Sequence, residues 1–74
     1  NPTDNNFNVE IDSFSRETVT IEVYDGLGRI IQTASIAKDG SRKTTISLDG
    51  YGSGAYLVRC YTNLYKKSFK VIKL

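Results

Sequence analysis

Few residues in this chain of 74 could carry out catalysis. The sequence contains no histidine, the residue most often used as a general base and as a metal ligand. Its single cysteine, Cys60, excludes a disulfide within the chain and a multi-cysteine zinc site. With no histidine to activate it, Cys60 is expected to behave as a small buried hydrophobic residue. We therefore expect no catalytic residue and no enzymatic activity.

The acidic residues are spread along the chain instead of forming a ligand cluster. Calcium would require several oxygen ligands that converge on one point, and no segment has that pattern. We therefore expect neither a metal nor a cofactor. The net charge of +2, from 10 basic and 8 acidic residues, is too balanced to indicate a nucleic acid partner.

Basic residues are concentrated near the C-terminus, at Lys66, Lys67, Lys70 and Lys73. A charged cluster is usually a solvated surface, and lysines on an edge strand discourage edge-to-edge aggregation. A strand with an open edge can also pair with a partner by strand addition. The sequence leaves both interpretations open.

The elements that must position these residues are strands, because apolar residues recur at every second position. The alternating segments lie at 7–11, 19–23, 56–60 and 69–71, with looser ones at 30–36 and 46–48. A further short strand is expected within residues 36–44. This spacing predicts an all-β fold, an immunoglobulin-like antiparallel β-sandwich of about six to seven strands.

Turn residues separate the predicted strands. Residues 25–28 place Asp25 first and Gly28 fourth in a type I turn, with Gly28 at positive φ in a hairpin that contains a bulge. Asp39-Gly40 predicts a second turn. Residues 62–64 are expected to join the last two strands, with Asn63 in the left-handed region.

Gly54 and Tyr56 begin the fifth alternating segment. Glycine is favoured where the backbone needs conformational freedom. The tyrosine ring is expected to be buried, with its hydroxyl group bonded to a partner.

The order of these motifs resembles the C-terminal sorting domain of type IX secretion cargo proteins. The resemblance covers the Asn1-Pro2 start, the strand and turn at 19–29, the Gly-x-Tyr strand at 54–59 and the basic end at 66–74. It implies that residues 1–74 form one sorting domain. Because the chain opens at Asn1-Pro2 and not at methionine, we also expect it to be a fragment of a larger protein.

The resemblance implies a signal that directs a larger cargo protein across the outer membrane. The implied partners are outer-membrane shuttle and translocon proteins and a sortase-like cysteine endopeptidase that removes the domain as the cargo is attached to the cell surface. The implied location is the periplasm in transit, then the outer membrane, the cell surface or the medium.

The resemblance also assigns residues to roles. Asp25 and Gly28 are expected to form a structural turn. The residues expected to be recognised by the translocon are Gly54, Tyr56, Lys66, Lys67, Phe69, Lys70, Val71, Ile72, Lys73 and Leu74.

Two alternatives remain open from the sequence. An adhesive or carbohydrate-binding sandwich would use exposed aromatic side chains, for which Tyr24, Tyr51, Tyr61 and Tyr65 are candidates; the same residues could equally pack across strands. An exposed terminal strand would also allow a strand-paired or swapped homodimer.

Overall fold

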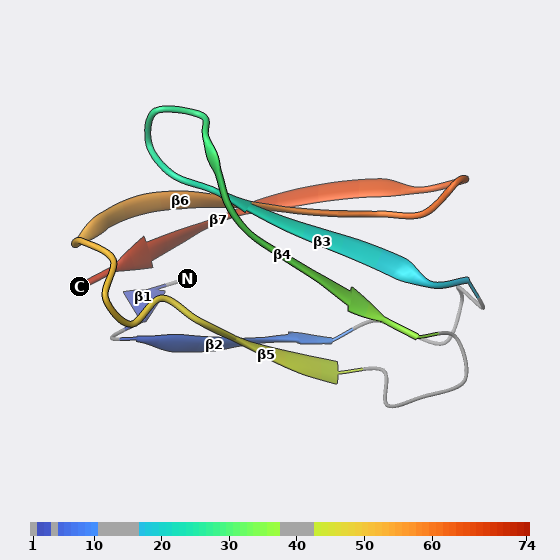
Figure 1. Ribbon diagram of the computed structural model, residues 1–74, viewed down its shortest axis with the longest axis horizontal. Helices are drawn as coiled ribbons and strands as arrows, with labels where there is room; N and C mark the ends of the chain where they lie inside the picture. The colour runs from blue at the N-terminus through green and yellow to red at the C-terminus, as the bar shows by residue number, and fades with distance from the viewer. Residues whose placement is uncertain (1, 4, 11–16, 38–42) are drawn as a thin grey trace.

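The computed structural model describes residues 2–3, 5–10, 17–37 and 43–74, and within these ranges every regular element is a strand (Figure 1). The strands are β1 (Pro2–Thr3), β2 (Asn6–Glu10), β3 (Val19–Tyr24), β4 (Ile30–Ile36), β5 (Lys43–Ser47), β6 (Gly54–Tyr61) and β7 (Lys66–Lys73).

These strands form two sheets that pack face to face. The larger sheet has the order β1-β7-β6-β3-β4, and the smaller sheet is the pair β2-β5. Figure 1 shows the smaller sheet lying against one face of the larger one. Neighbouring strands are antiparallel, except that β1 runs parallel to β7. The predicted all-β sandwich is therefore confirmed.

Burial alternates along the strands, as a half-buried sheet requires. We call the side of each sheet that faces the other sheet its inner face, and the opposite side its outer face. In β3 the inner residues Val19, Ile21 and Val23 are buried, and the residues between them are partly exposed. The buried hydrophobic residues are Val9, Val19, Ile21, Val23, Ile36, Ile46, Leu48, Tyr56, Val58, Cys60 and Val71. The expectation that Cys60 faces the core is confirmed.

The further strand expected within residues 36–44 stays a prediction. Ile36 ends β4 and Lys43 begins β5, while residues 38–42, including the predicted turn at 39–40, lie outside the described residues. The structure adds a strand that the sequence analysis did not predict, β1, which pairs with β7 at Ile72 and Lys73. A two-residue strand is too short for an alternating pattern to predict it.

The predicted turn at Asp25 is confirmed in its details. Gly28 has a φ of 84°, and its N–H donates to the Asp25 carbonyl at 3.0 Å. The Asp25 carboxylate oxygen Oδ1 accepts from the N–H groups of Leu27, at 2.9 Å, and Arg29, at 3.0 Å. The β3–β4 register shifts between Val23 and Tyr24, which is the expected bulge.

The loop between β6 and β7 closes differently from the prediction. Among the described residues only glycines have positive φ, so the prediction of a left-handed Asn63 is wrong. The Thr62 side chain stabilises the turn instead, because its Oγ1 accepts from the N–H groups of Leu64 and Tyr65, each at 3.0 Å. A threonine hydroxyl can stabilise a turn in this way without a left-handed residue.

The sandwich predicts that alanine substitution of two isomeric aliphatic residues will change the free energy of unfolding by very different amounts. Ile21 is 0% exposed on the inner face, whereas Leu57 is 43% exposed on the outer face. Ile21→Ala should cost about 2–5 kcal/mol through lost burial and a cavity. That is comparable with the ~3–5 kcal/mol that a core of this size supplies. Urea denaturation should show Ile21→Ala largely unfolded and the Leu57→Ala control close to the parent; equal destabilisation would contradict the assignment of the faces.

Candidate functional site

The residues predicted to be recognised lie mainly on β7, whose alternation divides them between two faces. Val71 lies opposite Tyr56 and Phe69 opposite Val58, and both β6 partners are buried in the core. The inner-face residues of β7 are therefore Lys67, Phe69, Val71 and Lys73. The outer-face residues are Lys66, Ser68, Lys70 and Ile72. The four lysines accordingly do not share one face of the sheet.

The inner-face residues anchor the strand. Val71 is completely buried and Phe69 packs against the core. The Lys73 ammonium group donates to the backbone carbonyl of Tyr51, which ties the strand to the loop before β6. Lys67 is exposed, and Leu74 is 69% exposed beyond the end of the strand.

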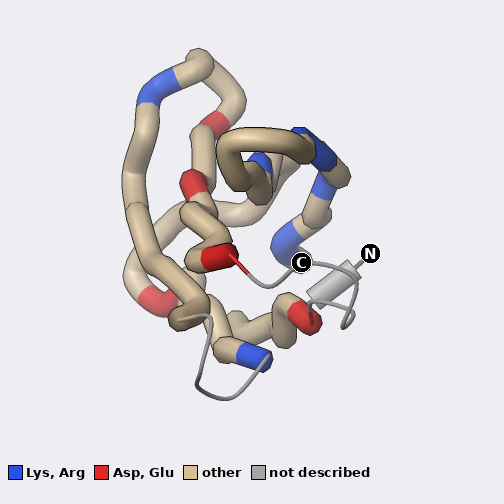
Figure 2. Tube along the Cα trace, turned by 90° about the vertical axis from the view of Figure 1, so that its right-hand side faces the viewer, with Lys and Arg blue, Asp and Glu red and all other residues tan. Residues whose placement is uncertain are grey.

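One edge of β7 is only partly covered. β6 pairs with β7 along its full length, from Gly54 opposite Lys73 to Tyr61 opposite Lys66. On the other edge, β1 pairs only at Ile72 and Lys73, and no other described strand pairs with 66–71. Figure 2 shows Lys and Arg positions gathered on the β6–β7 side of the molecule. This open edge is therefore both basic and able to form backbone hydrogen bonds.

Gly54 and Tyr56 lie beside the end of β7, so the structure brings the two predicted groups together. Gly54 has a φ of 142° and pairs with Lys73. Tyr56 is buried opposite Val71, and its hydroxyl donates to the backbone carbonyl of Gly52. The expected burial and hydroxyl partner of Tyr56 are confirmed. Both residues support the end of β7 from within the sheet.

The outer face carries a polar cluster that the sequence analysis did not identify. The Glu22 carboxylate accepts from the hydroxyls of Tyr24, at 2.7 Å, and Tyr61, at 3.2 Å. Arg59 lies opposite Glu22 on β6, and its guanidinium carbon is 5.6 Å from the centre of the Tyr61 ring. In the sequence, all four residues occupy outward positions of the alternating segments. The sequence does not show that β3 and β6 are neighbours, so it could not group these residues into a cluster.

Two tyrosine pKa values reflect this cluster. The hydrogen bond to Glu22 is the main cause that raises the pKa of Tyr24. Burial, followed by the hydrogen bond to Glu22, raises the pKa of Tyr61. Both hydroxyls therefore remain protonated donors at neutral pH. Of the other two aromatic candidates, Tyr51 donates its hydroxyl to the Ile31 carbonyl, and Tyr65 lies in the loop after β6.

Catalytic and metal-binding groups are sparse in the part of the chain that the structure describes. Burial raises the pKa of the Cys60 thiol, which disfavours the thiolate that nucleophilic chemistry requires. Among the described residues, no three His, Cys, Asp or Glu side chains are grouped so that they could hold a metal ion. No described helix could cross a membrane.

The Asp25 turn should give the domain a pH-dependent stability. Hydrogen bonds from the backbone of Arg29 are the largest cause that lowers the pKa of Asp25, with the Leu27 N–H and the Arg29 side chain adding to them. A carboxylate with a lowered folded-state pKa stabilises the fold above its unfolded pKa, about 3.9. That contribution is lost as the pH falls through the folded-state pKa.

Asp25→Asn should therefore be less stable than the parent chain at pH 7, and the difference should shrink towards pH 2–3 as Asp25 becomes protonated. The amide can still accept the backbone bonds but cannot pair with Arg29, which lies 2.9 Å from Oδ2. Thermal denaturation of both chains across this range measures the difference. A difference in stability between the two chains that stays constant across the pH range would show that the charge of Asp25 does not contribute to the stability of the fold.

Comparison with known families gives a match that covers the whole chain. No curated protein matches the sequence. A family model described as a secretion system C-terminal sorting domain matches residues 1–74, which include the Gly-x-Tyr strand and the basic end. The match agrees with the resemblance seen in the order of the motifs. The chain therefore belongs to the family of type IX secretion system C-terminal sorting domains.

Proposed function

We propose that residues 1–74 act as one sorting domain that carries a larger cargo protein through the type IX secretion system. The family is one of sorting signals and not of catalysts, and its members direct cargo across the outer membrane. The observation that carries the finer proposal is the edge of β7, which is open over 66–71 and flanked by lysines.

In this proposal, a strand of an outer-membrane shuttle or translocon protein pairs with the open edge of β7. Main-chain hydrogen bonds provide affinity in such strand addition, and alternate side chains provide specificity. Lys66 and Lys70 would contact the partner on one side of the added strand and Lys67 on the other. Acidic residues on the partner would complement them.

The remaining predicted residues act indirectly in this mechanism. Val71 and Tyr56 are buried, so they hold β7 in place and do not themselves contact the partner. Gly54 permits the backbone conformation at the start of β6, opposite Lys73. Ile72 and Lys73 lie where β1 covers the edge, and Leu74 follows them. A partner that extends its pairing to these residues would have to displace β1.

After translocation, a sortase-like cysteine endopeptidase would remove the domain and attach the cargo to the cell surface. The domain is then a substrate of that enzyme. Before translocation, the same open edge could pair two copies in a homodimer, which would compete with recognition. We propose no carbohydrate-binding function, because the family match supports a sorting signal.

A fluorescent protein that carries residues 1–74 at its C-terminus should be exported by a strain with the type IX machinery. Deletion of 70–74 should abolish export, because it removes half of the recognised strand. Flexible residues appended after Leu74 leave every strand intact and should also block export, if the machinery must reach the end of β7. Export is measured as fluorescence in the medium and on intact cells.

Charge substitutions test the edge without shortening it. The triple variant Lys66→Gln, Lys67→Gln, Lys70→Gln keeps the strand but removes its charges, and export should fall several-fold as steering of the partner is lost. Lys43→Gln, an exposed lysine on β5 in the smaller sheet, is the control and should export normally. Normal export of both the triple variant and the extended chain would refute recognition through β7.

A further inference from the structure

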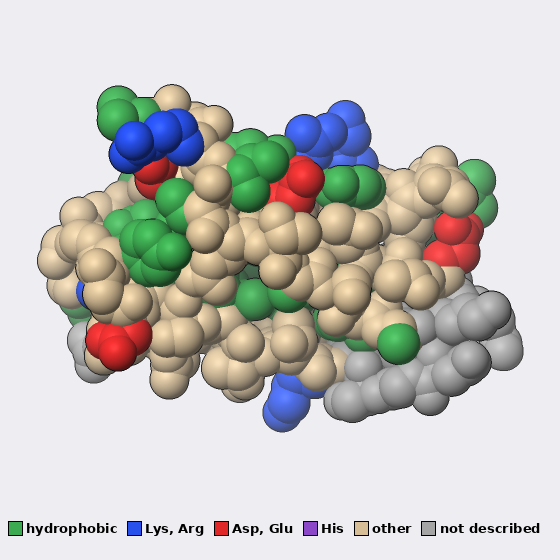
Figure 3. Space-filling view, in the orientation of Figure 1, with side chains coloured by type: hydrophobic (Ala, Val, Ile, Leu, Met, Phe, Trp, Pro, Cys, Tyr) green, Lys and Arg blue, Asp and Glu red, His purple; other side chains and the backbone are tan. Residues whose placement is uncertain are grey.

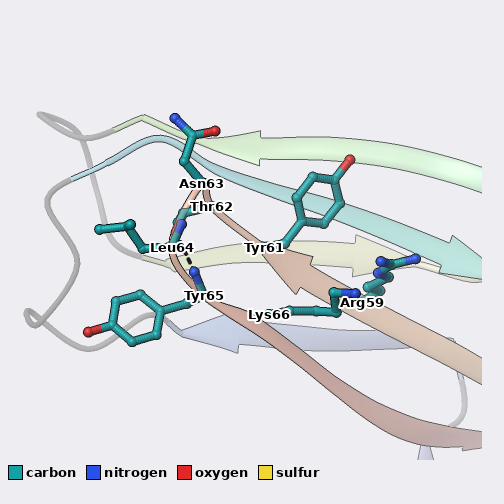
Figure 4. Close-up of a pocket in the computed structure, with 7 residues that line it drawn as sticks. All are labelled: Arg59, Tyr61, Thr62, Asn63, Leu64, Tyr65 and Lys66. Carbon is teal, nitrogen blue, oxygen red and sulfur yellow. Dashed lines mark hydrogen bonds between the residues drawn. The ribbon is translucent and has the colours of Figure 1, made fainter.

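A hollow of about 220 Å³ opens beside the hairpin of β6 and β7, lined by residues 59 and 61–66. Figure 4 shows Arg59, Tyr61 and Lys66 at one end of it and Leu64 and Tyr65 at the other. In the same view the Lys66 side chain extends towards Arg59. Two cations and an aromatic ring therefore line the same end of one concave surface.

The Nε–H group of Arg59 lacks a hydrogen-bond acceptor. Its Nε atom is buried and has no hydrogen-bond partner. Glu22 lies opposite on β3 and accepts hydrogen bonds from Tyr24 and Tyr61, but it forms no ion pair with Arg59. Among the described residues neither Arg59 nor Lys66 forms an ion pair. A buried donor without an acceptor is costly, and such atoms in folded proteins are usually satisfied.

A carboxylate would satisfy these requirements at once. A planar guanidinium pairs with a carboxylate through charge-assisted hydrogen bonds, which are stronger than those between neutral groups. The carboxylate would also relieve the repulsion between Arg59 and Lys66. The cation–π contact of Arg59 with the Tyr61 ring restricts the guanidinium before binding, so less conformational freedom is lost on binding.

The residues at the other end of the hollow indicate which group of the ligand lies next to that carboxylate. Leu64 is 77% exposed and Tyr65 is 55% exposed, beside the cationic end. An apolar side chain next to the acidic one would cover them. A peptide provides both groups on one chain, whereas a small carboxylate or an acidic sugar provides only the charge. Figure 3 shows hydrophobic, basic and acidic side chains along the upper surface of the molecule, where the larger sheet lies.

We propose that this hollow binds an acidic peptide segment of a partner protein, with its carboxylate on Arg59 and Lys66 and an adjacent apolar side chain on Leu64 and Tyr65. The site uses side chains of the outer face and the hairpin, whereas strand addition uses the backbone edge of β7. Lys66 contributes to both, but this inference does not depend on export, and the hollow can be tested with the purified chain alone.

The test is a titration of the isotopically labelled 74-residue chain, followed by NMR, with a short blocked peptide of Glu-Leu pairs. The expected result is saturable shifts of the Arg59 Nε–H signal and of the Tyr61 and Lys66 signals. The matched peptide with Gln in place of Glu should bind about tenfold more weakly or not at all, because it lacks the charge.

Variants then assign the binding to the proposed side chains. Arg59→Gln and Lys66→Gln should each weaken binding by about tenfold, and Arg59→Lys should recover only part of it, because lysine lacks the planar fork. Lys43→Gln is the matched control: it is a lysine of β5 in the smaller sheet that does not line the hollow, and binding should be unchanged. Dispersed amide spectra verify that each variant is folded. If Arg59→Gln does not fold, the Lys66→Gln variant, which changes an exposed residue, provides the test.

Three results would overturn the proposal: equal binding of the Glu and Gln peptides, an equal loss in Lys66→Gln and Lys43→Gln, or an Arg59 signal that does not move. Acetate and glucuronate are titrated in parallel. If either binds as tightly as the peptide, the hollow is a general carboxylate site and the peptide assignment is wrong. The titration does not measure export. A failed titration therefore does not contradict recognition through β7, and a failed export experiment does not contradict peptide binding at the hollow.

Discussion

The pairing of β6 with β7 is the constraint on which the rest of the structure depends. Its register places Val71 beside Tyr56 and Phe69 beside Val58, so the last strand is fixed to the core by its inner residues. The same register determines which lysines lie on each face. If it slipped by one residue, every side chain of β7 would move to the opposite face. The placement of the β7 lysines and the stability of the fold are therefore set by the same hydrogen bonds.

The smaller sheet contributes little to the core, which explains why the register between β6 and β7 is strictly required. β2 and β5 supply few core residues, chiefly Val9 and Ile46, with Leu48 following β5. A chain of this size buries only about 60% of the surface that it exposes when unfolded. Each buried aliphatic side chain therefore carries a large share of the stability. The residues that we propose for recognition lie on the outer face, in the hairpin and along the edge of β7, where substitutions cost little stability.

Local patterns in the sequence predicted much of this architecture. Alternation identified the six longer strands and the burial of Cys60, and turn chemistry identified the hydrogen bonds of Asp25 and the positive φ of Gly28, because each depends on residues close in sequence. The remaining features depend on long-range pairing. β1 is defined only by its neighbour β7, and the Glu22 cluster requires β3 and β6 to be adjacent. The four lysines lie close together in the sequence, but the pleat places Lys67 and Lys73 on the opposite face from Lys66 and Lys70.

The burial of Cys60 bears on how the domain tolerates the compartments through which exported proteins travel. A thiol attacks a disulfide as its thiolate and needs a clear approach to the sulfur. Cys60 lies on the inner face opposite Ile21, where its sulfur is shielded and ionisation is disfavoured. The folded chain is therefore protected against mixed disulfides with cargo or with other secreted proteins, and only unfolding would expose that reactivity.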